Sequence, residues 1–548
     1  MSKIGRMRRS RFLASSIGIT CAAALALSMT LLASATASTT PAERTAAVPT
    51  PIPGTTQSLP LAPRGADRGF GSAAVEQGLG RRDVRSFSLV GVVWDDPDAE
   101  LQGRVQVRTR AKGTSSWSGW QDVETHNHEH AADPDTAEWA SGRVRGSTAP
   151  LWVGESDGVE VRVRAEARRR TAAPGEQMLP DGLRLELVDP GSDVPGDATG
   201  APDVPDTGGV TSVTDATGAT GVTDAAGATG VTDAAGATDP AGVVSTASTA
   251  SAVSTPSAVG TPSAVGTPSA VGTASTASPV GAAGPAVGPP PVVTPVDSPR
   301  LAALTAESVA ASAVNADLAP LGATVIPALS REETEARLAE LEPGSKPYIG
   351  PRPQIVTRRG WGADEKLRER DFLYTERVQA AFVHHTASGN NYRCAQAPTV
   401  IRSIYRYHVV SSGWRDIGYN FLIDKCGNIY EGRAGGVAKP VMGAHTLGFN
   451  KNSMGIAVLG SFTSTMPSDA AVRAIAQLTA WKLGLYRANP NGKTYLTSGG
   501  GNLYRKGKKV RLNVISGHRD GFATECPGGR LYGKLGAARS EAAHYQGR

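Results

Sequence analysis

The 548-residue sequence predicts a multidomain protein, in which a small all-β, sandwich-like domain and a long disordered linker precede a C-terminal domain of mixed α/β type. Three observations predict this organisation. Alternating apolar and polar residues are concentrated in residues 81–190, residues 191–300 are of low complexity, and residues 351–540 mix helix-like and strand-like patterns. The 64 Gly and 37 Pro, with only 5% aromatic residues, also fit a chain with long unstructured segments.

The first 37 residues have the features of a secretory signal peptide. A basic run at 3–11 precedes an apolar stretch at 12–32 and a small-residue site that ends at Ala37. The apolar stretch is long enough for an uncleaved membrane anchor, and Cys21 offers a lipoprotein alternative, but the small-residue site favours cleavage. We therefore expect a secreted or cell-wall protein with no stable membrane anchor after signal cleavage.

The net charge does not indicate a nucleic-acid partner. The chain carries a formal charge of +6, and the signal region contributes five basic residues and no acidic ones, which leaves about +1 on the mature protein. We expect no nucleic-acid binding and a monomeric protein.

A β-rich domain is predicted at 81–190, after a linker at 38–80 that is rich in Pro, Thr, Ala and Gly. Runs such as Val105–Thr109 and Val159–Val163 alternate with a period of two and are separated by turn residues, which is typical of antiparallel strands with one buried face. Five of the eight tryptophans fall here, and they fill the core or offer stacking surfaces for sugar rings: Trp94, Trp117, Trp120, Trp139 and Trp152.

A histidine-rich stretch, Thr125–His130, lies in the same region. His126, His128 and His130 alternate, which would place them on one side of an extended segment and allow a metal site. Their polar neighbours favour a solvated loop instead.

Residues 191–300 repeat short motifs with periods of nine and then six residues. Almost no large apolar residue is present, so the segment cannot offset the entropy of ordering, and we expect a disordered linker. A short helical segment follows at 301–350, where Ser330 caps a helix with an acidic first turn.

The C-terminal domain is predicted to contain elements that each have a clear period or cap. They are a strand at Val378–His384, a helix at Pro398–Val410, a hairpin of Tyr419–Ile423 and Asn428–Glu431, a strand at Gly455–Leu459, a helix from Ser468 to Leu483 and a strand at Leu512–Ile515 that leads to His518.

A metal site is suggested by histidines and a cysteine in this domain. One histidine of the pair His384-His385 together with His518 and Cys526 would supply two imidazoles and a thiolate, which can hold zinc with one coordination position open. Three cysteines remain after signal removal, and since Cys526 is needed for the metal, Cys394 and Cys426 form the natural disulfide.

Residues 351–535 contain a series of short motifs in this order: Phe382-Val-His-His-Thr-Ala387, Tyr405-Arg-Tyr-His408, Gly413–Ile423, Gly427–Arg433, Gly443-Ala-His-Thr446, Asn452–Ile456, Gly517-His-Arg-Asp520 and Cys526-Pro-Gly528. In these motifs and their order the domain resembles the peptidoglycan recognition protein family, which is similar in fold to the type 2 N-acetylmuramoyl-L-alanine amidases; secreted actinobacterial amidases are similarly built.

The resemblance implies that His384, His518 and Cys526 bind Zn²⁺. It also implies that Tyr419 lies beside the metal and that Thr524 assists catalysis. The expected reaction is hydrolysis of the amide between N-acetylmuramic acid and L-alanine in peptidoglycan, for cell-wall remodelling or lysis. Wall glycans are a further expected partner, through the β-rich domain.

Four more residues are assigned to substrate binding: His385, Trp414, Arg433 and His445. Three of them have a structural alternative, because His385 could pack beside the metal, Arg433 could brace its hairpin and His445 could be structural. The alternative function is a non-catalytic peptidoglycan-binding module. Ala434-Gly435 stands where relatives that prefer diaminopimelate peptides often have Gly-Trp, so the sequence does not define the preferred stem peptide.

Overall fold

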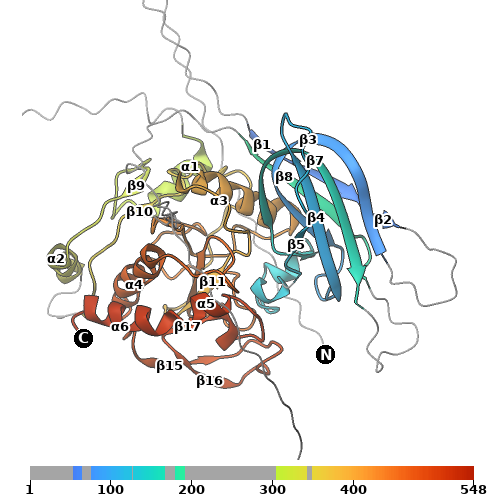
Figure 1. Ribbon diagram of the computed structural model, residues 1–548. Helices are drawn as coiled ribbons and strands as arrows, with labels where there is room; N and C mark the ends of the chain where they lie inside the picture. The colour runs from blue at the N-terminus through green and yellow to red at the C-terminus, as the bar shows by residue number, and fades with distance from the viewer. Residues whose placement is uncertain (1–52, 65–75, 126, 167–178, 192–303, 342–347) are drawn as a thin grey trace, which may run out of the picture.

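The computed structural model describes residues 53–64, 76–125, 127–166, 179–191, 304–341 and 348–548. These residues form a β domain (53–191) and a C-terminal domain (304–548) that pack against each other (Figure 1). The expected signal peptide, residues 38–52 and the low-complexity linker from 192 onward lie outside the described residues. Within the described ranges, no helix has both the length and the apolar character needed to cross a membrane.

The β domain is built on one eight-stranded sheet with the order β1-β8-β3-β7-β4-β5, in which β2 and β6 pair with β3. Irregular pairing between β3 and β7 marks bends in these long strands, and the curled sheet encloses an apolar core that includes Phe87, Val105, Val161 and Leu185 (Figure 1). The strands are β1 (Pro53–Pro60), β2 (Ala62–Pro63), β3 (Glu76–Trp94), β4 (Gly103–Ala111), β5 (Gln121–Val123), β6 (Gly146–Ser147), β7 (Leu151–Ala165) and β8 (Arg184–Gly191).

The predicted linker at 38–80 is wrong for residues 53–64, which contain β1 and β2, and for residues 76–80, which begin β3. β1 pairs with β8 over its full length, from Pro53 opposite Gly191 to Pro60 opposite Arg184. The flanking prolines hid this strand because proline is tolerated only on edge strands or at strand ends, and β1 is an edge strand.

The C-terminal half of strand β3, from Phe87 to Trp94, is buried on both faces. Val90 and Val92 point into the core of the β domain, whereas Leu89 and Val93 join a second buried cluster with residues of the C-terminal domain. A continuous apolar run is what a strand covered on both sides requires. The two domains therefore share an apolar interface.

The C-terminal domain is organised on a mixed seven-stranded sheet with the order β17-β11-β14-β12-β13-β10-β9. Its centre is parallel, since β11 pairs in parallel with both β14 and β17, and β12 and β13 form the predicted antiparallel hairpin. The strands are β9 (Val325–Ile326), β10 (Ile355–Val356), β11 (Ala380–His385), β12 (Phe421–Ile423), β13 (Ile429–Glu431), β14 (Ser453–Val458) and β17 (Ile515–Gly517).

Helices cover both faces of this sheet. The long helix α4 and the C-terminal helix α6 pack on one face, and α3 lies on the other face, next to the β domain (Figure 1). Ser468 caps α4 as predicted, because its hydroxyl accepts a hydrogen bond from Ala471 N at 3.1 Å. The helices are α1 (Ala306–Ala313), α2 (Arg331–Leu341), α3 (Ala397–Arg406, followed by a π-helical turn at Tyr407–Ser411), α4 (Asp469–Gly484), α5 (Gly529–Tyr532) and α6 (Leu535–Tyr545).

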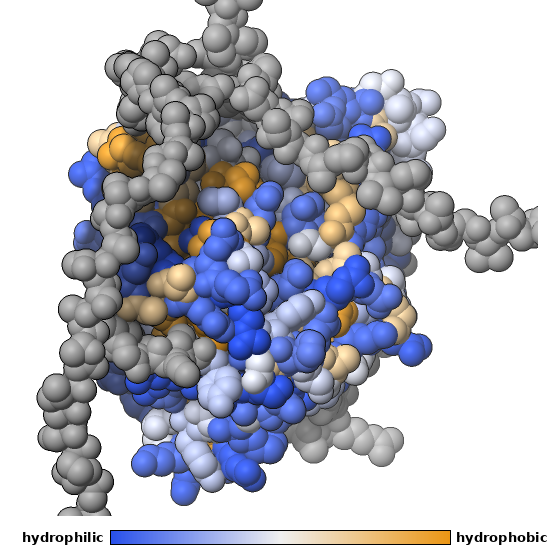
Figure 2. Space-filling model, turned by 90° about the vertical axis from the view of Figure 1, so that its left-hand side faces the viewer, coloured by the Kyte–Doolittle hydropathy of each residue, from blue (hydrophilic) through white to orange (hydrophobic). Residues whose placement is uncertain are grey.

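The segment predicted as separately helical, 301–350, packs onto the C-terminal domain. Ser330 caps α2, and Leu338 and Ile326 belong to the same buried cluster as α4 and α6. Figure 2 shows a predominantly hydrophilic face in which apolar residues gather in separate groups.

The predicted strand Leu512–Ile515 is wrong in its bounds. Val514 separates β16 (Lys509–Asn513), which forms a two-stranded ribbon with β15 (Lys493–Thr497), from β17, which belongs to the main sheet. The apolar residues are continuous across this change of sheet, so periodicity alone does not reveal it. The strand β17 nevertheless leads directly to His518, as expected.

Candidate metal centre

His384 and His518 meet because their strands are parallel neighbours. In the register of β11 and β17, Val383 lies opposite Gly517, so the next residue on each strand is a histidine. Both are fully buried, and their ring centroids are 4.5 Å apart. The carboxyl ends of adjacent parallel strands are the usual place for a ligand site in such sheets.

Cys526 reaches the same point from a loop that folds back after β17. Its carbonyl accepts a hydrogen bond from Arg519 N at 3.1 Å, and its Sγ lies 3.8 Å from His384 Nδ1. Gly528, with φ of +85°, lets the loop pass the backbone of Phe462, where a Cβ would lie 2.3 Å from the Phe462 carbonyl carbon. The Cys-Pro-Gly sequence thus allows the tight approach that places the thiol.

A third histidine, His130, completes the cluster from the β domain. It lies in the one-turn 3-10 helix His128–His130, between β5 and β6, which Figure 1 shows between the two domains. The ligand atoms of His130, His384, His518 and Cys526 all lie within 4.8 Å of one another. The preference for a solvated loop at 125–130 is therefore wrong for His130, which is only 4% exposed. His126 lies outside the described residues.

The chemistry of these four side chains fits a metal ion. His518 Nε2 lies 3.1 Å from the carbonyl oxygen of Glu129, which can only accept, so Nε2 carries the proton and Nδ1 keeps its lone pair. Among the described residues, His518 Nδ1 and both ring nitrogens of His130 are buried without a hydrogen-bond partner. Uncompensated buried nitrogens are costly, and a bound cation would satisfy one nitrogen of each of these two rings.

Burial also sets the protonation of the cluster. Desolvation, with the neighbouring imidazoles, lowers the pKa of His384 and His518 well below the usual value and that of His130 to about 3. The rings are therefore neutral, as metal ligands must be. Burial raises the pKa of the Cys526 thiol, and a bound metal would oppose that effect by stabilising the thiolate.

The His384 ring is oriented by a neighbouring histidine outside the cluster. His445 Nδ1 lies 3.3 Å from His384 Nε2, which leaves His384 Nδ1 toward the thiol. Gly455 gives the His445 ring its space, since a Cβ there would lie 2.4 Å from the ring. His445, assigned to substrate binding from the sequence, is fully buried and is placed to position a ligand.

Tyr419 and Thr524, the two expected catalytic residues, both flank the cluster. The Tyr419 ring is 5.5 Å from the His384 ring and 5.9 Å from the His130 ring. Thr524 Oγ1 accepts from Cys526 N at 3.1 Å and donates to Glu129 of the β domain at 2.8 Å. Burial raises the pKa of Tyr419 well above its usual value, so its phenol stays protonated.

Arg433 meets a carboxylate of the same chain. Its guanidinium donates from Nη1 and Nη2 to Glu138 of the β domain, at 2.8 and 3.0 Å, and both side chains are at most 5% exposed. Its Nε donates to Ile417 O at 2.9 Å. Neither the interdomain pair nor the insertion of His130 was predicted, because contacts across 295 residues leave no local pattern.

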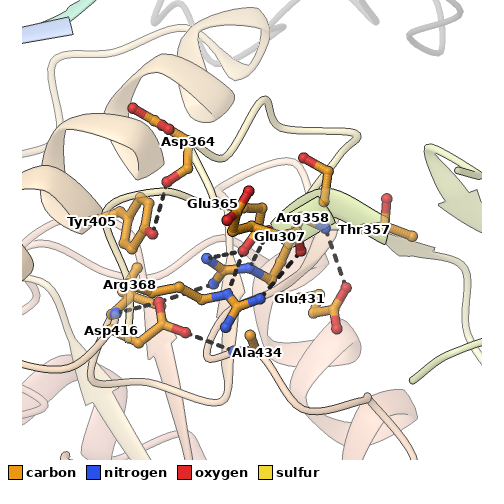
Figure 3. A network of polar contacts seen from close by, with 12 residues as sticks. Glu307, Thr357, Arg358, Asp364, Glu365, Arg368, Tyr405, Asp416, Glu431 and Ala434 are labelled. Atoms are coloured by element: carbon orange, nitrogen blue, oxygen red, sulfur yellow. Dashed lines mark hydrogen bonds and ion pairs between the residues drawn. The ribbon is translucent and has the colours of Figure 1, made fainter. Parts of the chain in front are cut away.

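A buried network of polar contacts around Arg358 holds the backbone beside the metal cluster (Figure 3). Arg358 donates to Asp416 at 3.0 Å, and the other oxygen of Asp416 accepts from Ala434 N at 2.9 Å. Arg433 N in turn donates to Tyr419 O at 2.8 Å. The backbone that carries both Tyr419 and Arg433 is thus tied to a fully buried guanidinium.

The remaining predicted residues pack around the site. His385 is buried, with Nε2 3.6 Å from Glu124 of the β domain, and the Trp414 ring packs on His408 at 4.3 Å. His408 is buried, as expected for a core residue. The predicted disulfide is present between Cys394 and Cys426, with a Cα–Cα distance of 6.2 Å.

Two family models match the chain. Residues 41–180 match a family described as Rv3811 N-terminal galactose-binding domain-like, and residues 374–529 match the N-acetylmuramoyl-L-alanine amidase family. The first match begins before the predicted β domain and includes β1, in agreement with the fold.

Curated relatives align with the C-terminal third of the chain. Peptidoglycan-recognition protein SC2 of Drosophila simulans is 34% identical over 182 residues, which span 33% of this chain and 84% of the fly protein. The human N-acetylmuramoyl-L-alanine amidase is 32% identical over 191 residues, which span 33% of this chain and 28% of the human protein. The solved Drosophila PGRP-LB is 26% identical and covers 33% of this chain and 91% of its own, with a TM-score of 0.26. On the sequence relationship, the chain belongs to the peptidoglycan-recognition protein family.

Proposed function

We propose that the protein is a zinc-dependent N-acetylmuramoyl-L-alanine amidase that hydrolyses the bond between N-acetylmuramic acid and the L-alanine of the stem peptide. The observation that carries the proposal is the convergence of His384, His518 and Cys526 at the ends of two parallel strands. A zinc ion held there would polarise the scissile carbonyl and lower the pKa of a water molecule toward ~7.

The residues around the cluster suit this reaction. The neutral phenol of Tyr419 can donate a hydrogen bond to the oxygen on which negative charge develops, a contact whose loss costs ~10²–10³ in rate. His445 holds the His384 ring, and Thr524 holds the backbone at Cys526. His445 and Thr524 act by positioning, and Tyr419 acts by hydrogen-bond donation.

The proposed setting is the cell wall. The N-terminal pattern of a basic run, an apolar stretch and a small-residue site supports secretion. The half-buried Trp117 and Trp120 in the β domain support a contact with wall glycans. Arginines stack on these rings, with the Arg162 guanidinium 4.0 Å from the Trp120 ring, so sugars would have to displace them.

One observation favours the second candidate, a non-catalytic peptidoglycan-binding protein. His130 gives the cluster four protein ligands, which is the usual number for a structural zinc site. Metal binding alone therefore does not establish hydrolysis.

The two candidates are separated by incubating the zinc-loaded protein with purified cell walls, with and without a chelator. Hydrolysis releases stem peptides with a free L-alanine amino terminus, and both the chelator and Cys526→Ser abolish the release. Wall binding without release, in the wild type and in variants with an altered β domain, would support the binding module and overturn the amidase.

A further inference from the structure

We propose that His130 is a fourth metal ligand, and that the docked β domain holds the amidase site in a closed, latent state that opens only when this domain moves away. This inference rests on the proposed function, because it describes regulation of the same site. It assigns a role to the histidine-rich stretch that the reaction itself does not use.

The first support is the placement of the His130 ring. It lies 4.5 Å from the His518 ring and 5.3 Å from the His384 ring, and it is fully enclosed. Both of its nitrogens are buried without a partner among the described residues, although a histidine that only fills a core normally has one. A nitrogen aimed at three other metal-binding atoms is placed to join them.

The coordination number gives this placement a consequence. Two imidazoles and one thiolate leave an open position for water, as catalytic zinc sites require, whereas three imidazoles and a thiolate complete a tetrahedral site. The docked chain would therefore bind metal well and still have no position for the attacking water.

The β-domain segment that carries His130 also contacts residues predicted to bind substrate or assist catalysis. Glu138 places a carboxylate on Arg433, which is predicted from the sequence to bind substrate. Glu129 accepts a hydrogen bond from Thr524, and its carbonyl faces His518. The β domain thus places an imidazole in the metal cluster and carboxylates on Arg433 and Thr524.

Docking is supported well beyond the site. Asp133 accepts hydrogen bonds from Gly448 N at 2.6 Å and Asn450 Nδ2 at 2.9 Å. On the far side of the interface, Tyr407 donates to Thr148 O at 3.1 Å and packs directly on Gly91. These contacts fix the segment that carries His130, so its position does not depend on one side chain.

The test uses the full mature chain with His130→Ala. The matched control is His128→Ala in the same 3-10 helix, because the ring of His128 bonds to Pro97 O at 2.9 Å and lies outside the metal cluster. The readouts are the visible spectrum of the cobalt-substituted protein, the zinc affinity by competition with a chelator, and the release of stem peptides.

We expect His130→Ala to change the cobalt absorption bands to those of a site in which a solvent molecule is one ligand. Zinc binding should weaken at least ~10–100-fold, because even the loss of an outer partner of a ligand has that effect. The substitution should also raise peptide release above the wild-type level. His128→Ala should leave all three readouts unchanged. Glu138→Gln, which keeps His130 but weakens docking, should raise release and shift the cobalt spectrum partly.

An unchanged cobalt spectrum and zinc affinity in His130→Ala would overturn the fourth ligand, whether or not the protein is an amidase. A shifted spectrum with no peptide release in any variant would instead keep the ligand and overturn the proposed function. Thermal unfolding of each variant confirms that the comparison is made between folded proteins.

Discussion

The ion pair between Glu138 and Arg433 offers the sharpest test of how the two domains are held together. The change is Glu138→Gln, which removes the charge and keeps the size. The wild-type carboxylate accepts two hydrogen bonds from Arg433 and one from Arg415 N at 3.1 Å, and the two paired side chains are 2% and 5% exposed. The substitution therefore leaves a buried guanidinium without its counter-charge.

The expected magnitude is large because the pair is buried. Removing one partner of a buried ion pair costs ~3–5 kcal/mol, whereas an exposed pair is worth ~0–1 kcal/mol. The pKa of Glu138 gives the pH dependence: burial alone would raise it, but the charges and hydrogen bonds of Arg433 and Arg415 together outweigh burial and lower it. A lowered carboxyl pKa means that the stabilisation is present above the ordinary glutamate pKa and is lost as the pH falls through the lowered value.

The assay is urea unfolding of the zinc-free chain at neutral pH, followed by tryptophan fluorescence. The control is Asp135→Asn, since Asp135 forms an interdomain pair with Lys506 at 2.6 Å but both side chains are 64% exposed. We expect Glu138→Gln to lower the free energy of unfolding by ~3–5 kcal/mol and the control to change it by less than ~1 kcal/mol. Equal, small effects of the two variants would refute the buried interdomain pair.

Four further predictions follow from the site. Cys526→Ser should lose zinc and hydrolysis together, as measured by metal content and peptide release; equal metal content in variant and wild type would contradict the ligand. Tyr419→Phe, made together with His130→Ala, should lower kcat by ~10²–10³ relative to His130→Ala alone with wall binding retained, and an unchanged rate would remove its proposed role. Cys394→Ser should lower the free energy of unfolding by roughly 2–5 kcal/mol without metal loss, whereas zinc loss would place the disulfide in the site. Burial raises the pKa of Asp133 to about 6, so its ionisation destabilises the fold as the pH rises from about 4 to 6; Asp133→Asn should gain ~1–3 kcal/mol relative to the wild type over that interval, and parallel stability curves would argue against it.

Much of the C-terminal domain could be predicted from the sequence because its signals are local. The apolar strand that ends at His384, the Ser468 cap and the hairpin of β12 and β13 each depend on residues within a few positions. The metal ligands were assigned from a family resemblance whose motifs are equally local. The structure places His384, His518 and Cys526 together, as that resemblance implies.

The rest depends on contacts between distant parts of the chain. His130 is separated from His384 by the whole low-complexity region, and its polar neighbours are typical of a solvated loop. Those neighbours are polar because Glu129 and Asp133 bond to the other domain. Strand β1 was missed for a similar reason, since only its pairing with β8 distinguishes it from a proline-rich linker.

The most direct test of the central claim is the identity of the bond that is cut. Purified cell walls are incubated in the presence of zinc with the wild type, His130→Ala or Cys526→Ser, and the soluble products are analysed by mass spectrometry. The account predicts stem peptides that begin with a free L-alanine and glycans that keep the lactyl carboxylate, most abundant with His130→Ala and absent with Cys526→Ser. Products cut elsewhere, or none from any zinc-loaded variant, would contradict it.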